Sequence, residues 1–241
     1  MRFEEFLKKN LINKEFNKNQ KEKITEIIKD NDISAMEDQL KKYRGTKEWF
    51  YFLEVLEALE SITQTRTQLV FNKDWEEIKN KIKEYKENNA WPLFIQLAEK
   101  MKRFTKEDIE ISEKDWEKIK NSLSLFKEHG TWISFSDTLI AMYSLNPKEK
   151  IEISKEDWEE MKSALEKFKK ENNVQSFVEL ASNLNRLSTM LNKNEKISIT
   201  QNEANKIKEK LKEYKEVQNW ILLSSLLNKM KNLDIEIAKK N

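Results

Sequence analysis

Apolar residues recur in this chain in blocks of about 41–42 residues, and every block repeats one internal spacing. The clearest copies begin at Asp74-Trp75, Asp115-Trp116 and Asp157-Trp158, and a less regular copy flanks them on each side. Counted from the first apolar position of a block, apolar residues recur at offsets 3, 7 and 10, and then at 16, 19, 22 or 23, and 26. A repeat of this length is typical of stacked helical hairpins.

Each block predicts two helices, which we name A and B. The first four apolar positions form one stripe of a 3.6-residue period, and the later ones form a second stripe. Residues that tolerate a left-handed conformation stand between the two stripes. They are Asn88-Asn89, His129-Gly130, Asn172-Asn173 and Gln218-Asn219, with Gly45 in the first copy. We therefore expect both glycines of the chain to lie at this one turn position.

The starts of the A helices carry matching signals. Ser112, Ser154 and Thr200 stand three residues before Asp115, Asp157 and Glu203, which is the spacing of a capping box or its close relative. An isoleucine precedes each cap, and an apolar residue occupies the fourth helical position, as in a hydrophobic staple. The Asp-Trp dipeptide therefore predicts a structural role, with Asp at the positive end of the helix dipole and Trp against the incoming chain.

The connectors between blocks also repeat. They read Ile109-Glu110-Ile111, Ile151-Glu152-Ile153, Ile197-Ser198-Ile199 and Ile235-Glu236-Ile237. Their apolar residues fall on one side of an extended chain, so we expect each connector to bury two isoleucines against the next hairpin. The last connector either folds back onto the last hairpin or stays exposed.

One hairpin cannot bury its apolar stripe alone, so the pattern predicts an all-α fold, an α-solenoid of about five tandem hairpins with a period of about 42 residues. The predicted array covers residues 32–241, in units of approximately 32–71, 72–111, 112–153, 154–199 and 200–241. Residues 1–31 fit the repeat poorly and predict an N-terminal helical cap, or alternatively a mobile partner-binding arm. In outline the pattern resembles HEAT-like and TPR-like repeats. The period is too long for TPR and the TPR signature residues are absent.

Composition agrees with a helical array. Two glycines and two prolines are too few for the corners of an α/β or all-β domain. The 45 basic and 43 acidic side chains give a net charge of +2, so no bulk field favours nucleic acid or a membrane surface. The chain has no cysteine, and no segment approaches the ~20 apolar residues of a membrane span. Acidic residues stand where a secretory signal would be apolar, and we therefore expect a soluble, cytoplasmic protein.

No residue pattern predicts catalysis. The single histidine, His129, stands in a predicted turn, and no glycine-rich segment could cradle a phosphate. Most carboxylates alternate with lysines, which is typical of a solvated helix face. We therefore predict no catalytic, cofactor-binding or metal-binding residues, no cofactor and no enzyme.

The B helices are poorer in charge than the A helices. Asp137 is the only charged residue between Thr131 and Asn146, and Lys229 is the only one between Trp220 and Met230. Such helices are either deeply buried or shaped for contact with a protein. Their predicted outward positions, at offsets 21 and 24, are Glu54, Glu57, Gln96, Glu99, Asp137, Ile140, Glu179, Ser182, Ser225 and Asn228. This acidic to neutral ladder suits a basic or polar protein segment better than a phosphate backbone, although its carboxylates could equally serve only to keep a groove soluble.

The leading hypothesis is a protein-binding adaptor or inhibitor that uses the B helices, if they line the concave face. The pattern does not say which helix row is concave. A second hypothesis is nucleic-acid binding through A-helix lysines such as Lys79, Lys83 and Lys86. A third is a structural protein that self-associates end to end through Ile235 and Ile237. The Lys, Glu and Asn bias favours a bacterial or mobile-element origin.

Overall fold

The prediction of an all-helical protein is confirmed. The computed structural model describes residues 24, 27–63, 70–147, 152–193 and 195–235, and most of these residues are helical. The A helices of the described residues are α3 (Asp30–Thr46), α5 (Asn72–Glu87), α7 (Glu113–Glu128), α9 (Lys155–Lys170) and α11 (Gln201–Glu216). The B helices are α4 (Trp49–Thr63), α6 (Trp91–Thr105), α8 (Trp132–Leu145), α10 (Val174–Met190) and α12 (Trp220–Met230).

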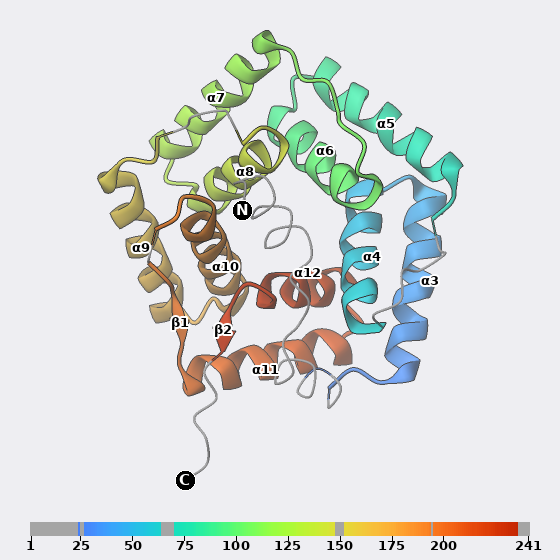
Figure 1. Cartoon of the computed structure of the whole chain (residues 1–241). Coiled ribbons are helices and arrows are strands. Elements are labelled where there is room, and N and C mark those ends of the chain that lie inside the picture. The colour runs from blue at the N-terminus through green and yellow to red at the C-terminus, as the bar shows by residue number, and fades with distance from the viewer. Residues whose placement is uncertain (1–23, 25–26, 64–69, 148–151, 194, 236–241) are drawn as a thin grey trace. The chain divides into compact units, whose positions relative to one another are not determined.

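The chain divides into two compact units, which we describe separately. Unit 2 is continuous and covers Val70–Ser176. Unit 1 combines two distant segments, Met1–Leu69 and Phe177–Asn241. Unit 1 therefore brings together the first helical pair of the described residues, α3 and α4, and the last, α11 and α12 (Figure 1).

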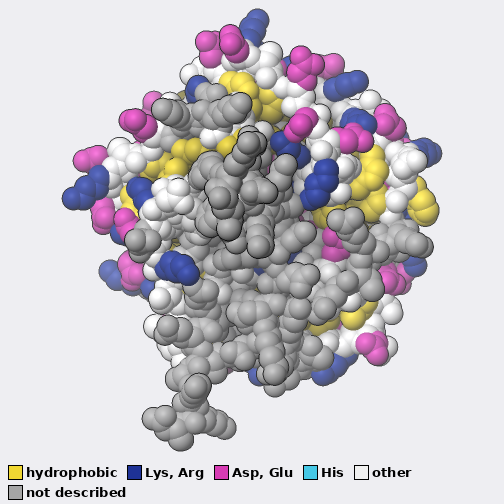
Figure 2. All heavy atoms as spheres, viewed as in Figure 1, with side chains coloured by type: hydrophobic (Ala, Val, Ile, Leu, Met, Phe, Trp, Pro, Cys, Tyr) yellow, Lys and Arg dark blue, Asp and Glu magenta, His cyan; other side chains and the backbone are white. Residues whose placement is uncertain are grey.

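Unit 2 has an inner and an outer layer of helices. The inner helices α6 and α8 pack against each other, and α5 and α7 cover them from outside (Figure 1). The interior is apolar: Phe94, Leu97, Phe135 and Leu139 are each at most 2% exposed. Figure 2 shows basic and acidic side chains intermingled along the outer side, over α5 and α7. The predicted amphipathic pattern of the A helices is thus realised here.

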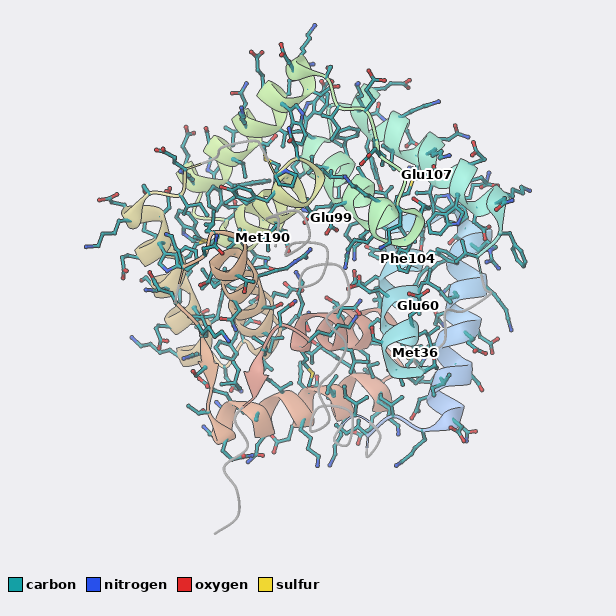
Figure 3. All side chains as sticks on the ribbon, viewed as in Figure 1. Met36, Glu60, Glu99, Phe104, Glu107 and Met190 are labelled. Carbon is teal, nitrogen blue, oxygen red and sulfur yellow. The ribbon has the colours of Figure 1, made fainter. Side chains whose placement is uncertain are left out.

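In unit 1, α12 lies between α10 and α4. The Asn228 side-chain amide donates to the Glu54 backbone carbonyl, 2.9 Å away, and α10 reaches α12 from the other side, where Lys229 donates to Asn183. The core of this unit contains Met36, which points from α3 toward α4 (Figure 3), and Phe52, both fully buried. Ile24, Ile27 and Ile28 are also buried. Residues 1–23, 25 and 26 of the predicted cap lie outside the described residues.

The predicted helix starts are confirmed. In α7 the Ser112 hydroxyl accepts from the Asp115 backbone N–H, and the Asp115 carboxylate accepts from the Ser112 N–H. The same reciprocal pair forms between Ser154 and Asp157 in α9, and between Thr200 and Glu203 in α11. These pairs satisfy helix N–H groups that lack a partner in the preceding turn.

The predicted turns are confirmed in part. Asn89, Gly130, Asn172 and Gln218 adopt left-handed backbone conformations, with φ between 54° and 63°. The prediction that Gly45 is equivalent to Gly130 is wrong, because Gly45 lies inside α3 and the left-handed residue is Lys47, at φ 60°. Two residues separate α3 from α4, whereas three residues separate the two helices of each later hairpin.

Two of the predicted extended connectors pair with each other in unit 1. β1 (Ser198–Ile199) and β2 (Asp234–Ile235) form a short parallel pair. Asn185 of α10 fixes both segments: its carbonyl accepts from the Ile197 N–H at 2.6 Å, and its amide donates to the carbonyls of Ile197 and Asn232. The last connector therefore folds back up to Ile235, while Ile237 lies outside the described residues.

Candidate binding surface on the B helices

The ten predicted binding residues divide into a buried and a half-buried set. Glu54, Glu99, Ile140, Ser182 and Asn228 are buried. Glu57, Gln96, Asp137, Glu179 and Ser225 are half-buried. Unit 1 holds those of α4, α10 and α12, and unit 2 holds those of α6 and α8. The buried set is accessible to a partner only if neighbouring helices move.

In unit 1 the predicted residues contact one another across helices. The Ser225 hydroxyl donates to the Glu179 carboxylate at 3.3 Å, and the Ser182 hydroxyl accepts from the Asn232 amide at 3.0 Å. The Asn228 amide reaches the Glu54 carboxylate at 2.9 Å. These bonds join α10 to α12 and α12 to α4, so the polar residues of this face hold the B helices of unit 1 together.

The register of these contacts gives the helix directions. Glu54 and Glu57 of α4 pair with Asn228 and Lys231, in the same order along the chain. The two helices therefore run in the same direction, and their first turns lie at the same end. An equivalent order of contacts relates α10 to α12, through Glu179 with Ser225 and Asn183 with Lys229.

In unit 2 the predicted residues lie on the inner helices. Glu99 lies on α6, where Figure 3 labels it, and its carboxylate is 3.1 Å from Nε of Arg103, one turn later. The Lys102 ammonium donates to the Leu145 carbonyl of α8 at 3.4 Å. Gln96 and Asp137 are more exposed than Glu99. They are therefore the members of the ladder that a ligand could contact in unit 2.

A second feature, which the sequence analysis did not single out, is apolar exposure in the first turn of the B helices. Tyr51 of α4 is 47% exposed and Leu93 of α6 is 43% exposed, and the two occupy the same repeat position. Phe50, Pro92, Ile133, Ile221 and Leu222 are half-buried in the same turn of their helices. We call these seven residues the B-helix rim. The signal was present in the sequence as a second or third apolar residue after the helix-starting Trp.

Each unit carries its own part of the rim. In unit 1, Phe50 and Tyr51 lie at the same end as Ile221 and Leu222, because α4 and α12 run in the same direction. Val217, which is 66% exposed, directly follows α11 as its C-cap residue. In unit 2 the rim consists of Pro92 and Leu93 on α6 and Ile133 on α8. Exposed aromatic and aliphatic side chains without interleaved lysine are typical of protein-binding surfaces.

Several A-helix lysines pair with carboxylates. Lys79 lies 2.9 Å from Glu107 and 3.1 Å from Glu76, and Lys81 lies 2.7 Å from Glu84. Such pairs reduce the positive potential that a phosphate backbone would require. Exposed pairs of this kind contribute little to stability, about 0–1 kcal/mol each.

Two acids at helix starts are ionised more readily than usual. Burial raises the pKa of Asp115, but hydrogen bonds from the Lys86 ammonium, the Ser112 hydroxyl and the Ser112 N–H outweigh it, and the pKa is lowered. Asp157 has a lowered pKa for the same reasons: burial opposes the shift, and bonds from Lys127 and Ser154 produce it. Both carboxylates are thus held in their charged form.

Within the described part of the chain, no group of three or more His, Cys, Asp and Glu side chains is placed to hold a metal ion. His129 ends α7 as an exposed residue. None of the described helices is both long and apolar enough to span a membrane. In comparisons with known proteins, no family model, curated protein or solved structure matches the chain.

Proposed function

We propose that the chain is an α-solenoid of about five tandem hairpins that binds another protein along its B helices and acts as a non-enzymatic cytoplasmic adaptor or inhibitor. The repeat assignment is supported by the A helices α5, α7, α9 and α11, which start at residues 72, 113, 155 and 201. Three of these helices begin with the same reciprocal cap of a Ser or Thr and an acid. Helices that recur at a similar spacing with equivalent starts are typical of helical repeat arrays.

The observation that carries the binding proposal is the apolar exposure of the B-helix rim. In the first turn of their B helices, Tyr51 of α4 is 47% exposed and Leu93 of α6 is 43% exposed. Burying such side chains against a partner contributes about 25 cal/mol per Å² of apolar area. An apolar first turn that repeats from hairpin to hairpin therefore favours a partner that contacts several hairpins at once.

The half-buried polar residues next to the rim suit the partner chemistry that we propose. Gln96 and Asp137 in unit 2 are half-buried and carry an amide and a carboxylate. A partner segment with apolar and basic or polar side chains would match both features. The buried residues Glu54, Ser182 and Asn228 have a different part in this proposal, which is to hold the B helices together.

Two alternatives are less well supported. Nucleic-acid binding would use A-helix lysines, and the pairs of Lys79, Lys81 and Lys86 with carboxylates argue against a continuous basic track. An electrophoretic shift of random DNA or RNA that weakens with salt would revive it. The second alternative is end-to-end self-association through the last connector, in which Ile235 already pairs with Ile199 of the same chain.

The test compares affinity capture by three forms of the chain from an extract of its own cells. The rim variant carries Tyr51→Ser and Leu93→Ser. The control carries Leu125→Ser, because Leu125 is a comparably exposed leucine (53%) on the A helix α7. We expect proteins that bind the wild type to bind the control equally and the rim variant at least tenfold less. Equal capture by all three forms would exclude the rim as the binding surface.

A further inference from the structure

One contact between A helices recurs along the chain. The Lys86 ammonium near the end of α5 lies 2.6 Å from the carboxylate of Asp115, the third residue of α7. Lys127 near the end of α7 lies 2.6 Å from Asp157, the third residue of α9. In both cases the acid also caps its own helix. The contact therefore joins the end of one A helix to the start of the next, within unit 2.

The same contact joins the last A helix to the first, within unit 1. Lys215, near the end of α11, lies 2.9 Å from the carboxylate of Asp32, the third residue of α3. Asp32 also accepts from the Lys29 N–H, as Asp115 and Asp157 accept from their capping residues. Lys215 stands at the same repeat position as Lys86 and Lys127. The first hairpin thus presents to the last one the surface that a following hairpin would present.

The B helices of these two hairpins also fit each other. Asn228 of α12 donates to the Glu54 carbonyl and carboxylate of α4, and Lys231 lies 3.6 Å from the Glu57 carboxylate. The last hairpin supplies the donors, and the first hairpin supplies the acids. We call these six residues the end junction: Asp32, Glu54, Glu57, Lys215, Asn228 and Lys231.

The end junction is directional, because its two sides differ in charge and residue type. A surface of this kind does not pair with a second copy of itself. The surface of the last hairpin therefore pairs with the surface of a first hairpin. That first hairpin belongs either to the same chain or to a second copy of the chain. Within one chain the complementary hairpin is tethered, which raises its effective concentration above that of a second copy at ordinary protein concentrations.

We propose that the first hairpin is the intramolecular cap of the last one, and that the end junction denies this stacking surface to other copies of the chain. The cap packs on an apolar helix, because α4 contacts α12, in which Leu223, Leu226 and Leu227 are fully buried. End-to-end assembly through the last hairpin is then blocked as long as the junction is formed. This inference does not depend on the identity of any binding partner.

The experiment uses the full chain and a carbodiimide, which joins a lysine directly to a carboxylate that touches it. Equal amounts of unlabelled and 15N-labelled chain are mixed, treated and separated into monomer and dimer, and the joined peptides are identified by mass spectrometry. Lys86–Asp115 and Lys127–Asp157 are internal controls, because their exposures (41% and 7%, 36% and 11%) match those of Lys215 and Asp32 (31% and 11%).

We expect the Lys215–Asp32 product in the monomer fraction, in a yield within about threefold of the two controls, as three equivalent contacts should react alike. Its absence from the monomer while the controls form would overturn the proposal. So would its occurrence only in dimers that join labelled to unlabelled chain.

A second readout replaces Glu54 and Asn228 by cysteines in this cysteine-free chain. Air oxidation should yield a disulfide-bonded monomer, whereas a disulfide-bonded dimer or free thiols would contradict the cap.

Discussion

At the scale of single residues, the A-helix starts depend on carboxylates that perform two tasks. Asp115 closes the capping box of α7 and also accepts the Lys86 ammonium of α5, and Asp157 does the same for α9 and Lys127. Each charge therefore stabilises its own helix and the contact with the preceding one. The lowered pKa values of both acids make this contribution dependent on pH.

We predict that Asp115→Asn weakens the fold at neutral pH and loses its effect in acid. A lowered folded-state pKa means that the stabilisation is complete above the ordinary Asp pKa of 3.8 and disappears as the pH falls through the folded-state value. The expected loss is about 1 kcal/mol at pH 7, since Lys86 is partly exposed to solvent. Urea unfolding at pH 7 and below pH 3 measures the free energy of unfolding of the variant and the wild type under the two conditions. Glu117→Gln, an exposed change on the same helix, should leave stability unchanged; an equal loss in both variants would refute the assignment.

The two glycines should respond oppositely to alanine. Gly130 has φ +63°, where an L side chain is strained, so Gly130→Ala should destabilise by about 1 kcal/mol. Gly45 lies in α3 and a Cβ there would meet nothing within 4 Å, so Gly45→Ala should stabilise by about 0.5–1 kcal/mol. Thermal unfolding of the two single variants compares them directly. Changes of the same sign would contradict the turn geometry.

At the scale of elements, the sequence predicted most of the features that depend on neighbouring residues in the chain. The helix stripes, the Ser and Thr caps and the turns at Asn89, Gly130 and Asn172 follow from spacing and backbone preference, and the structure confirms them. The prediction for Gly45 was wrong because residues other than glycine can also end a helix. Here Lys47 adopts the left-handed conformation instead. The extended connectors were predicted, but their pairing as β1 and β2 depends on Asn185, which no local pattern marks.

We predict that Asn185→Ala loosens the β1–β2 pair without unfolding the helices. The change leaves the Ile197 N–H and the carbonyls of Ile197 and Asn232 without their buried partner, at a cost of about 2–3 kcal/mol. Hydrogen exchange of the backbone amides around Ile199 should accelerate more than tenfold, while amides in α7 stay protected. Asn121→Ala, at an exposed site of α7, is the control. Unchanged exchange near Ile199 would mean that Asn185 does not fix these strands.

At the scale of the whole molecule, the informative contacts join residues that are far apart in sequence. Asn228 and Glu54 are separated by 174 positions, and neither residue type nor spacing predicted that they meet. For the same reason the ladder of predicted binding residues contains Glu54, Ser182 and Asn228, which the structure buries in contacts between helices. The sequence shows extra apolar residues at Tyr51 and Leu93. Only the structure shows that these two side chains are exposed and do not belong to the core.

We predict that Lys215→Glu weakens unit 1 specifically. The new carboxylate would face Asp32, and the hydrogen bond from Lys215 to the Ile27 carbonyl, 2.8 Å long, would be lost. The expected destabilisation is about 1–2 kcal/mol, the range for hydrogen bonds to charged groups at a partly exposed site. Lys212→Glu, on the same helix and exposed, makes the same charge change as a control. Urea unfolding should separate the two variants, and equal midpoints would argue against the end junction.

The most direct test of this account is a distance between spin labels on the first and last A helices. Labels replace Asn31, next to Asp32, and Lys212, one turn before Lys215. The reference pair is Lys83 and Lys114, which are exposed residues at the same repeat positions beside Lys86 and Asp115. If the first hairpin follows the last as α7 follows α5, both pairs will give one narrow distance distribution with the same mean. A broad or longer distribution for the Asn31–Lys212 pair, beside a narrow reference, would contradict it.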